Sequence, residues 1–361
     1  MSDLSGKVLG HCHLQAVIGQ GAMATVYKGH HQTLGIPVAV KVMRTDPAVM
    51  RSPHAASFRD RFRREAQMAA RVNHSGIVRV LDFGEEMDIL YLVMEFVDGY
   101  TLQAYLRRAG CMGEEMAINV TAYLAIALQA AHSQNVLHRD LKPSNVLVTF
   151  DGWVKIADLG LAKEMGQNDL TRADTLVGTP TYMAPENFIA GSSVGPAADI
   201  YSLGIMLYEM VAGRPPYAGS LNRAISGHLQ GEPDYEVVFD GKPTPMPPGL
   251  VKLLKAMLAK KPAERPKDAT AVFDLCQARL AELRGGSPQT LADRNRDAGA
   301  NDSESSAFRK LSQFMEKNLG GTSSEYQGRS VVHTTARERI IIWILLALFV
   351  GFFLTAYFLR S

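Results

Sequence analysis

The sequence predicts an α+β protein with a small, β-rich N-terminal lobe and a larger, mainly helical C-terminal lobe. Two patterns support this: short strand-like runs dominate about residues 14–97, and helical apolar spacing dominates about residues 98–284. A third observation is an uncharged apolar run at residues 340–359. A chain of 361 residues is longer than one compact core requires, which fits a folded region with accessory segments.

The first part of the chain is predicted to form strands with one helix among them. The strand-like runs are LQAVIG, TVYKGHH, PVAVKVM, IVRVLDFG and LYLVMEF, which are rich in β-branched and aromatic residues. Residues 58–71 instead have the periodicity of a helix. Residues 1–13 are expected to be an N-terminal extension. They lack the long apolar core of a signal peptide, so we expect this end not to be exported.

The second part of the chain is predicted to be mainly helical. From Thr101 to about Arg284, apolar residues recur at helical spacing in MAINVTAYLAIALQAAHS, YSLGIMLYEMVAG and GLVKLLKAMLAK. Two short pieces, NVLVT and WVKIAD, have the pattern of strands. We therefore expect a helical lobe that contains a small β element.

The C-terminal part predicts a linker and a membrane anchor. Residues 285–339 are rich in Gly, Ser, Asp, Asn and Arg, as flexible linkers are. Residues 340–359 are long enough to cross the roughly 30 Å hydrocarbon layer as one helix. A buried core helix is the alternative, but such a helix seldom lacks a polar face. Two arginines precede the run and one follows it, which favours a cytoplasmic N-terminal side. We expect a single-pass cell-membrane protein, with residues 360–361 beyond the helix.

Composition excludes few functions. The formal net charge is +2, and charged residues make up 20% of the chain, so no strong positive field for nucleic acid is expected. The three cysteines are far apart and form no paired metal-binding spacing, which fits a reducing compartment.

Two N-terminal motifs suggest a nucleotide site. In IGQGAMATVYKG, Gly19 and Gly21 would allow the backbone to approach phosphates closely, although an ordinary β turn is the alternative. In VAVK and the valine that follows it, alternation places Ala39 and Lys41 on the face opposite to Val38, Val40 and Val42. A solvated lysine is the alternative there, and Glu65 in the expected helix is the candidate carboxylate that would hold Lys41 in place.

Two further motifs carry reactive groups. HRDLKPSN places Asp140, Lys142 and Asn145, a base, a cation and an oxygen ligand, within one short loop. KIADLG adds Asp158, a second hard oxygen ligand of the kind that Mg²⁺ prefers. An aspartate that merely stabilises a turn is the alternative for Asp158.

The motifs IGQGAMATV, VAVK, HRDLKPSN, DLG and APE stand in the order and approximate spacing of the eukaryotic-like (Hanks-type) protein kinases. The chain resembles this family over about residues 14–284. The resemblance implies the two-lobed protein-kinase fold, with ATP in the cleft and proteins as substrates. HRDLKPSN and GTPTYMAPE resemble the serine/threonine branch, and the apolar C-terminal run resembles bacterial transmembrane members.

The resemblance also implies a role for each matching residue. Asp140 would orient the substrate hydroxyl as the base, and Lys142 would neutralise the transferring phosphoryl group. Asn145 and Asp158 would hold Mg²⁺, for which Mn²⁺ could substitute. The residues implied to bind ATP are Ile18, Gly19, Gly21, Val26, Ala39, Lys41, Glu65, Met94, Glu95, Val97 and Leu147. Among these, Met94 would guard the back pocket, while backbone groups of Glu95 and Val97 would meet the adenine edge.

Regulation is implied in the same way. Arg139 is a cation that a phosphate on the activation segment would neutralise, with Thr171 and Thr175 as the expected phosphate carriers. Thr179 would line the acceptor site near Asp140.

Three further residues match structural positions of the family. Glu186 and Arg265 match a buried ion pair, and Asp199 matches the anchor of the catalytic loop. The departures are few, since Ala24 replaces the third glycine of the glycine-rich loop and Leu159 replaces the usual phenylalanine of the DFG motif.

The leading interpretation is an active serine/threonine kinase, because every group that phosphoryl transfer needs is present. A catalytically silent scaffold with the same fold, and a membrane adaptor whose linker carries docking sites, are the alternatives. Homodimerisation through the helix or the linker, or an unseen partner, is left open as the source of the activating signal.

Overall fold

The computed structural model of the protein describes residues 3–21, 24–44, 55–160, 180–239 and 242–285. All of them belong to Met1–Gly320, one of the two units into which the chain divides. Residues 286–339 of the predicted linker and the apolar run at 340–359 lie outside the described residues. Within the described part, no helix has both the length and the apolar character needed to cross a membrane.

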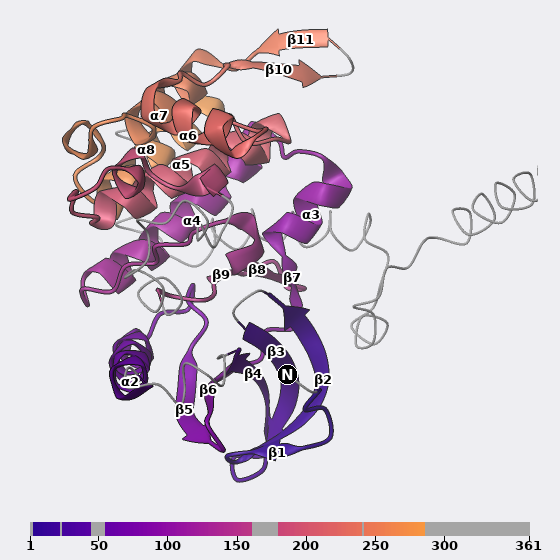
Figure 1. The fold of residues 1–361 in the computed structure, drawn as a ribbon. Coiled ribbons are helices and arrows are strands. Elements are labelled where there is room, and N and C mark those ends of the chain that lie inside the picture. Colours follow the sequence, from indigo (N-terminus) through magenta and orange to yellow (C-terminus); the bar gives the residue numbers. More distant parts are fainter. Residues whose placement is uncertain (1–2, 22–23, 45–54, 161–179, 240–241, 286–361) are drawn as a thin grey trace, which may run out of the picture. The chain divides into compact units, whose positions relative to one another are not determined.

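The N-terminal lobe is an antiparallel sheet with the strand order β1-β2-β3-β4-β6-β5 (Figure 1). Its strands are β1 (Val8–Leu9), β2 (Cys12–Gln20), β3 (Ala24–His31), β4 (Ile36–Met43), β5 (Val80–Glu86) and β6 (Ile89–Glu95). The helix of this lobe, α2 (Ala55–Arg71), contacts β5 and begins three residues before the predicted start. Phe62 anchors it, because this ring is buried in a cluster with residues of β3, β4 and β6.

The alternation predicted for β4 is present. Val38, Val40 and Val42 are fully buried in one apolar cluster, whereas Ala39 belongs to the main core on the other side of the sheet. Leu9, from the expected N-terminal extension, is buried in the same cluster as the valines. The folded lobe therefore begins before residue 14, because β1 adds an edge strand and apolar side chains to the sheet.

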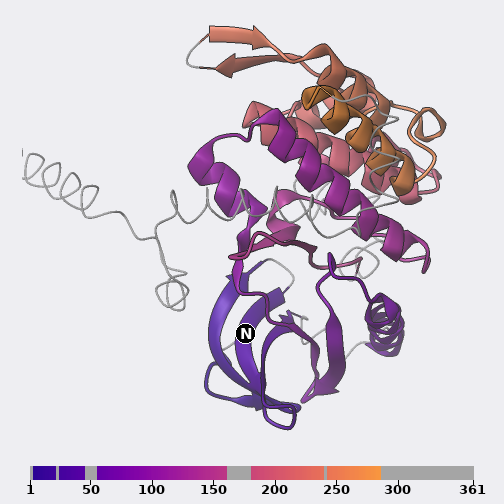
Figure 2. The same ribbon diagram turned by 180° about the vertical axis from the view of Figure 1, so that it is seen from behind.

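The C-terminal lobe is mainly helical, as expected (Figures 1 and 2). Its helices are α3 (Leu102–Ala109), α4 (Glu114–His132), α5 (Pro196–Ala212), α6 (Leu221–Gln230), α7 (Pro248–Met257) and α8 (Ala269–Leu283). Local signals set several ends: the side chains of Thr101, Ser220 and Asp268 accept the backbone N–H groups of the first turns of α3, α6 and α8. The helix α5 ends at Gly213, whose φ of 71° is left-handed.

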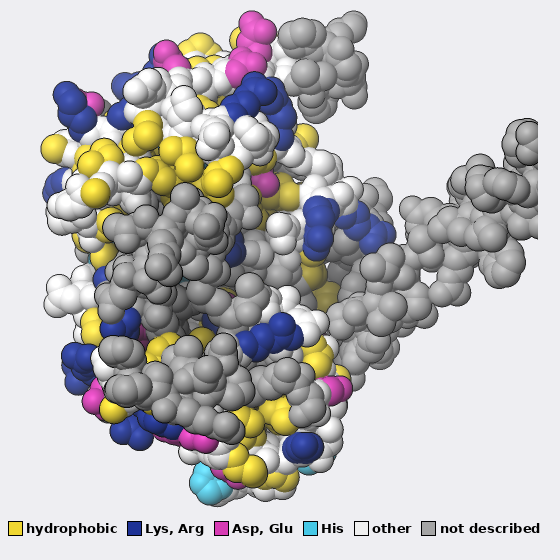
Figure 3. Space-filling view, in the orientation of Figure 1, with side chains coloured by type: hydrophobic (Ala, Val, Ile, Leu, Met, Phe, Trp, Pro, Cys, Tyr) yellow, Lys and Arg dark blue, Asp and Glu magenta, His cyan; other side chains and the backbone are white. Residues whose placement is uncertain are grey.

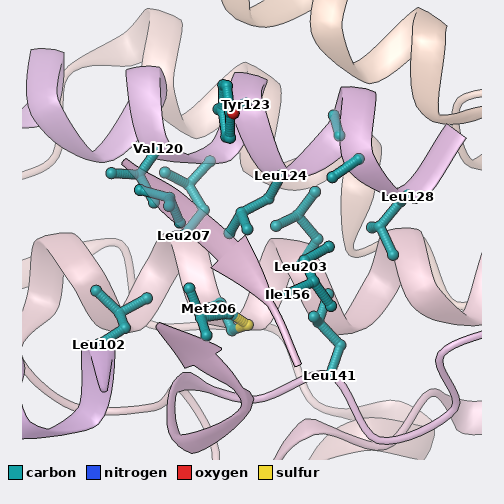
Figure 4. Packing of buried hydrophobic residues seen from close by; sticks show 14 of the residues in the cluster. Leu102, Val120, Tyr123, Leu124, Leu128, Leu141, Ile156, Leu203, Met206 and Leu207 are labelled. Carbon is teal, nitrogen blue, oxygen red and sulfur yellow. The ribbon is translucent and has the colours of Figure 1, made fainter. Parts of the chain in front are cut away.

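The core of this lobe forms where α4 packs on α5 and α8. Most residues of α5 are buried, so it has no polar face to present to solvent. Figure 4 shows leucines of α4 and α5 meeting around Ile156, with Met206 and Leu141 beside them. This packed centre supports the loops that carry the polar motifs.

A small sheet with the order β7-β8-β9 lies at the edge of the helical lobe. Its strands are β7 (Gly99–Thr101), β8 (Val146–Thr149) and β9 (Val154–Ile156), of which β8 and β9 were predicted and β7 was not. The isolated bridge between Ile77 and Ile156 connects it to the chain of the N-terminal lobe. A second unpredicted element is the hairpin β10 (Glu236–Phe239) and β11 (Lys242–Pro245), which follows α6.

Candidate active site

The loop that contains HRDLKPSN brings its reactive groups together as predicted. Lys142 Nζ lies 2.7 Å from Asp140 Oδ2. Asn145, in the short helix η1 (Pro143–Asn145), donates its amide hydrogens to the Asp140 carbonyl at 2.8 Å and to Asp140 Oδ2 at 3.2 Å. The Asp140 side chain is 37% exposed, and both side-chain contacts fall on Oδ2. An incoming hydroxyl can therefore reach Oδ1.

Asp199 of α5 anchors the HRDLKPSN loop through two hydrogen bonds to its backbone. Its Oδ2 accepts the backbone N–H of His138 at 2.9 Å, and its Oδ1 accepts the backbone N–H of Arg139, also at 2.9 Å. Burial by itself would raise the pKa of Asp199, but the hydrogen bond from His132 and the nearby His138 hold it below its ordinary value. The expected anchoring role is thus present in the structure.

The sequence analysis missed His132, at the end of α4. Its Nε2 lies 2.8 Å from Asp199 Oδ2, and both side chains are almost completely buried. The histidine thereby orients the carboxylate that holds the loop. The signal in the sequence was a histidine at the end of a mainly apolar helix, and such a residue has many unrelated explanations.

Asp158 follows β9 in a left-handed backbone conformation, with φ of 62°, and Arg139 has the same φ. Non-glycine residues seldom adopt this conformation, and it tends to occur at functional sites. The turn brings Asp158 Oδ1 to 2.9 Å from Lys41 Nζ. Burial raises the pKa of Asp158, but the charge and hydrogen bond of Lys41, together with the nearby His138 and Lys142, hold the pKa below its ordinary value.

The predicted pair between Lys41 and Glu65 is not formed in this structure. Lys41 pairs with Asp158 instead, and both carboxylate oxygens of Glu65 are buried without a hydrogen-bond partner among the described residues. Burial raises the pKa of Glu65 to about 7, although the charges of Arg139, Arg61 and Arg64 oppose this shift. The sequence placed Glu65 on the correct helix, but the packing of α2 does not bring its carboxylate to the lysine.

Several of the residues expected around adenine lie on paired strands of the N-terminal sheet. Ala39 is directly opposite Met94 in the pairing of β4 with β6, and Val26 is opposite Lys41 in the pairing of β3 with β4. The partly buried Val26, Val97 and Leu147 pack against the main core, in which Ala39 and Met94 are buried. Ile18 is 43% exposed at the end of β2. The structure thus gathers small and apolar side chains from both lobes.

The two glycines of the glycine-rich loop are not required by contacts within the described fold. A Cβ added at Gly19 would lie 3.6 Å from Val26 Cβ, and one added at Gly21 would lie 3.8 Å from the Ala24 carbonyl oxygen. Both are ordinary van der Waals distances, and neither glycine has a positive φ. Glycine at these positions is better explained by a group that approaches the backbone from outside, such as a phosphate.

Glu95 has a side-chain role that the sequence analysis did not foresee. Lys155 Nζ of β9 lies 2.7 Å from Glu95 Oε1, and the same oxygen accepts a hydrogen bond from the backbone N–H of Arg79 at 3.0 Å. The ion pair joins the last residue of β6 to the small sheet of the helical lobe. The expected contacts of Glu95 with adenine concerned only its backbone.

The three threonines with expected regulatory or acceptor-site roles, Thr171, Thr175 and Thr179, lie outside the described residues. Arg139, the expected phosphate-binding cation, lines a small hollow together with Asp140, Tyr182 and Met183. The hollow therefore places the segment after Thr179 next to the candidate base.

The oxygen ligands offered by Asn145 and Asp158 fit a magnesium ion. Asn145 and Asp158 are neighbours, because the Ala157 N–H donates to the Asn145 carbonyl at 2.8 Å. Their side chains offer hard oxygen ligands, and proteins commonly bind Mg²⁺ through one or two such groups together with phosphate oxygens and water. Asp158, held in its charged form by Lys41, suits this chemistry.

A family model described as "Protein kinase domain" matches residues 12–276. The chain therefore belongs to the protein kinase family. The matched region contains all the motifs above and begins at β2. Together with the lobes described here, the match confirms the two-lobed kinase fold that the sequence predicted.

The relatives of this kinase place it with the Hanks-type serine/threonine-protein kinases of bacteria. It is 41% identical over 267 residues to the probable serine/threonine-protein kinase SCO3848 of Streptomyces coelicolor, an alignment that covers 72% of this chain and 38% of that protein. It is 34% identical over 324 residues to PknH of Mycobacterium bovis, covering 88% and 49%. It is 36% identical over 306 residues to PknA of Mycobacterium tuberculosis, covering 83% and 68%. The chain thus spans half or less of the first two relatives.

Proposed function

We propose that this protein transfers the γ-phosphoryl group of ATP to serine or threonine hydroxyls of protein substrates. The observation that carries the proposal is the convergence of Lys41, Asp158, Asn145, Asp140 and Lys142, which lie up to 117 positions apart in the sequence, at the meeting of the two lobes. The reaction class is inferred from the similar proteins, which are named serine/threonine-protein kinases.

Each of these residues has a distinct role in the proposed reaction. Asp140 orients the substrate hydroxyl and accepts its proton, and Asn145 and Lys142 fix the carboxylate through Oδ2. Lys142 also lies where it can offset negative charge on the transferring group. Asn145 and Asp158 would hold Mg²⁺, with Mn²⁺ as a substitute, and the ion would supply positive charge that offsets the charge of the phosphates.

In the working state, we infer that Lys41 leaves Asp158 for the phosphates and that Glu65 then holds Lys41. The observations that support this step are the short Lys41–Asp158 pair and the unpartnered carboxylate of Glu65. A buried carboxylate without a partner is costly, and a lysine ammonium is the partner that would remove this cost. Phosphorylation at Thr171 or Thr175, with Arg139 as the receiving cation, is the proposed trigger.

The test of the proposed function is a transfer assay with the purified chain, radiolabelled ATP, Mg²⁺ and a basic protein such as myelin basic protein. Asp140→Asn should lower phosphate incorporation by at least about 100-fold, since general-base catalysis contributes at least this much. Asp151→Asn, in the exposed turn between β8 and β9, is the matched control and should retain activity. Equal incorporation by the wild type and Asp140→Asn would refute the proposed role.

For location, we propose a single membrane-spanning helix at residues 340–359, with the kinase domain on the cytoplasmic side. The uncharged apolar run and the polar residues before it support this proposal. A helix at this position would also offer a surface for homodimerisation beside the bilayer.

A further inference from the structure

A fully buried histidine in α6, His228, is surrounded by three aromatic rings. Its ring stacks on Phe188 at 6.0 Å between centroids, and it meets Tyr201 and Tyr217 edge to face at 5.7 Å and 4.9 Å. None of its surface is exposed to solvent. The neighbours come from η4 (Pro185–Phe188), from α5 and from the segment before α6, so the ring lies where these elements meet.

The two nitrogens of this ring have different surroundings. Nδ1 shares a 3.0 Å hydrogen bond with the hydroxyl group of Tyr201. Nε2 is buried and makes no hydrogen bond within ordinary limits to any described residue, although the backbone of Thr181 and Pro180 lies beside the ring. Burial and the charge of Lys260 lower the pKa of His228 to about 4, so the ring is neutral at physiological pH. A buried nitrogen of this kind calls for a partner.

Lys260 fixes the position of α6 and thereby of the ring. Its Nζ donates to the carbonyl groups of Gly227 and His228 at 2.9 Å and 3.0 Å, and to the Tyr217 hydroxyl at 3.1 Å. These carbonyl groups belong to the last turn of α6, where the Gly227 carbonyl also accepts the Gly231 N–H at 2.9 Å.

Tyr201 connects the same site to the buried ion pair. The guanidinium group of Arg265 lies over the Tyr201 ring at 4.8 Å and binds both carboxylate oxygens of Glu186, at 2.7 Å and 2.8 Å. The Tyr201 hydroxyl that bonds Nδ1 is thereby fixed in place, and the backbone of Pro180 and Thr181 lies beside the same ring.

That segment, η3 (Pro180–Tyr182) with Met183, lies next to the reacting groups. Tyr182 and Met183 line the same hollow as Asp140 and Arg139. The segment is tied to α5, because the Tyr182 hydroxyl donates to Glu209 at 2.6 Å and Ser202 donates to the Tyr182 carbonyl at 2.7 Å. A peptide whose hydroxyl sits at Asp140 must pass along this segment.

The surface beside the segment suits a peptide side chain. Figure 3 shows hydrophobic side chains gathered over α5 and α6 on the face that it presents. Two large apolar residues near the segment are substantially exposed: Ile189, which follows η4, at 51%, and Leu221, the first residue of α6, at 43%.

We propose that His228 is a positioning residue for protein substrates, which holds the Pro180–Met183 segment in its substrate-binding conformation by a hydrogen bond from Nε2 to the segment's backbone that closes when a peptide binds. The inference rests on the proposed kinase function. It names a residue in α6 that touches neither ATP nor the reacting atoms and that acts through the segment.

Two substitutions separate the ring nitrogens in the full-length protein. His228→Asn offers an amide near the position of Nδ1 only, whereas His228→Gln reaches the position of Nε2. We expect His228→Asn to raise the KM for myelin basic protein about tenfold while the KM for ATP changes less than twofold. In His228→Gln, the KM for myelin basic protein should be close to that of the wild type. Tyr208→Phe, which removes another buried hydroxyl from α5, is the control and should change neither KM.

A second readout does not depend on activity. With myelin basic protein bound, hydrogen–deuterium exchange at the amides of Thr181, Tyr182 and Met183 should be faster in His228→Asn than in the wild type, and close to the wild-type rate in His228→Gln. Equal exchange in all three proteins would overturn the inference. So would parallel rises in both KM values in both variants, which would indicate a purely structural role. If the wild type transfers no phosphate, the proposed function fails and the exchange result still decides the role of His228.

Discussion

Replacing Glu65 by glutamine should stabilise this protein and at the same time impair it. In the structure, the carboxylate of Glu65 is buried without a partner, and burial raises its pKa from 4.5 to about 7. Between these pH values the folded chain binds more protons than the unfolded chain, so this group lowers the free energy of unfolding as pH rises. The variant Glu65→Gln does not titrate and is free of this penalty.

The magnitude follows from the two pKa values. Full ionisation of Glu65 costs the folded state about 3 kcal/mol, at 1.36 kcal/mol for each tenfold change in proton affinity. The penalty is about 1 kcal/mol at pH 5.5 and about 3 kcal/mol at pH 8.5. The free energy of unfolding of the variant, relative to the wild type, should therefore rise by about 2 kcal/mol between these pH values.

The assay is urea unfolding of both proteins at the two pH values, because subtracting the wild type cancels every other titrating group. If the glutamine amide is left unpaired, it changes the difference in free energy of unfolding between variant and wild type by the same amount at both pH values. The comparison between the two pH values is therefore unaffected. Glu115→Gln is the control, since Glu115 is half exposed and pairs with Arg284.

The activity of Glu65→Gln should fall, although its stability rises. If Glu65 holds Lys41 in the working state, kcat/KM should fall by at least about tenfold, which corresponds to about 1.4 kcal/mol. A stability difference that does not change with pH would show that the carboxylate is not buried alone. Unchanged activity would show that Glu65 is not the working partner of Lys41.

Two further predictions concern the buried ion pair and the membrane anchor. Glu186→Gln should lower the free energy of unfolding by about 3 to 5 kcal/mol in urea titrations, because it leaves Arg265 buried without its charge partner; the exposed Glu264→Gln is its control, and a loss below about 1 kcal/mol would contradict the reasoning. Deleting residues 340–361 should release an active enzyme from carbonate-washed membranes, whereas deleting 286–339 should not; continued pelleting of the first variant would count against an anchor at 340–359.

Periodicity was sufficient to predict the elements that support the site. The alternation in VAVK predicted that Ala39 and the valines would face opposite sides, and the two clusters confirm it. The helix at α2 and the strands β8 and β9 were also predicted, because their apolar patterns match one period clearly. The hairpin β10–β11 was missed, since two of its eight residues are prolines and its strands lack a regular alternation.

The sequence by itself determined which chemical groups this protein possesses, since the order of HRDLKPSN, DLG and APE identifies the family before any contact is known. Only the tertiary structure decided which groups meet. Whether Lys41 pairs with Asp158 or Glu65 depends on the turn at Asp158 and on how Phe62 seats α2 against the sheet. The roles of His132 and His228 likewise arise from elements distant in the chain. Local patterns encode which face of a helix or strand a residue occupies, but an ion pair depends on placement within about 1 Å, which the packing of the whole core sets.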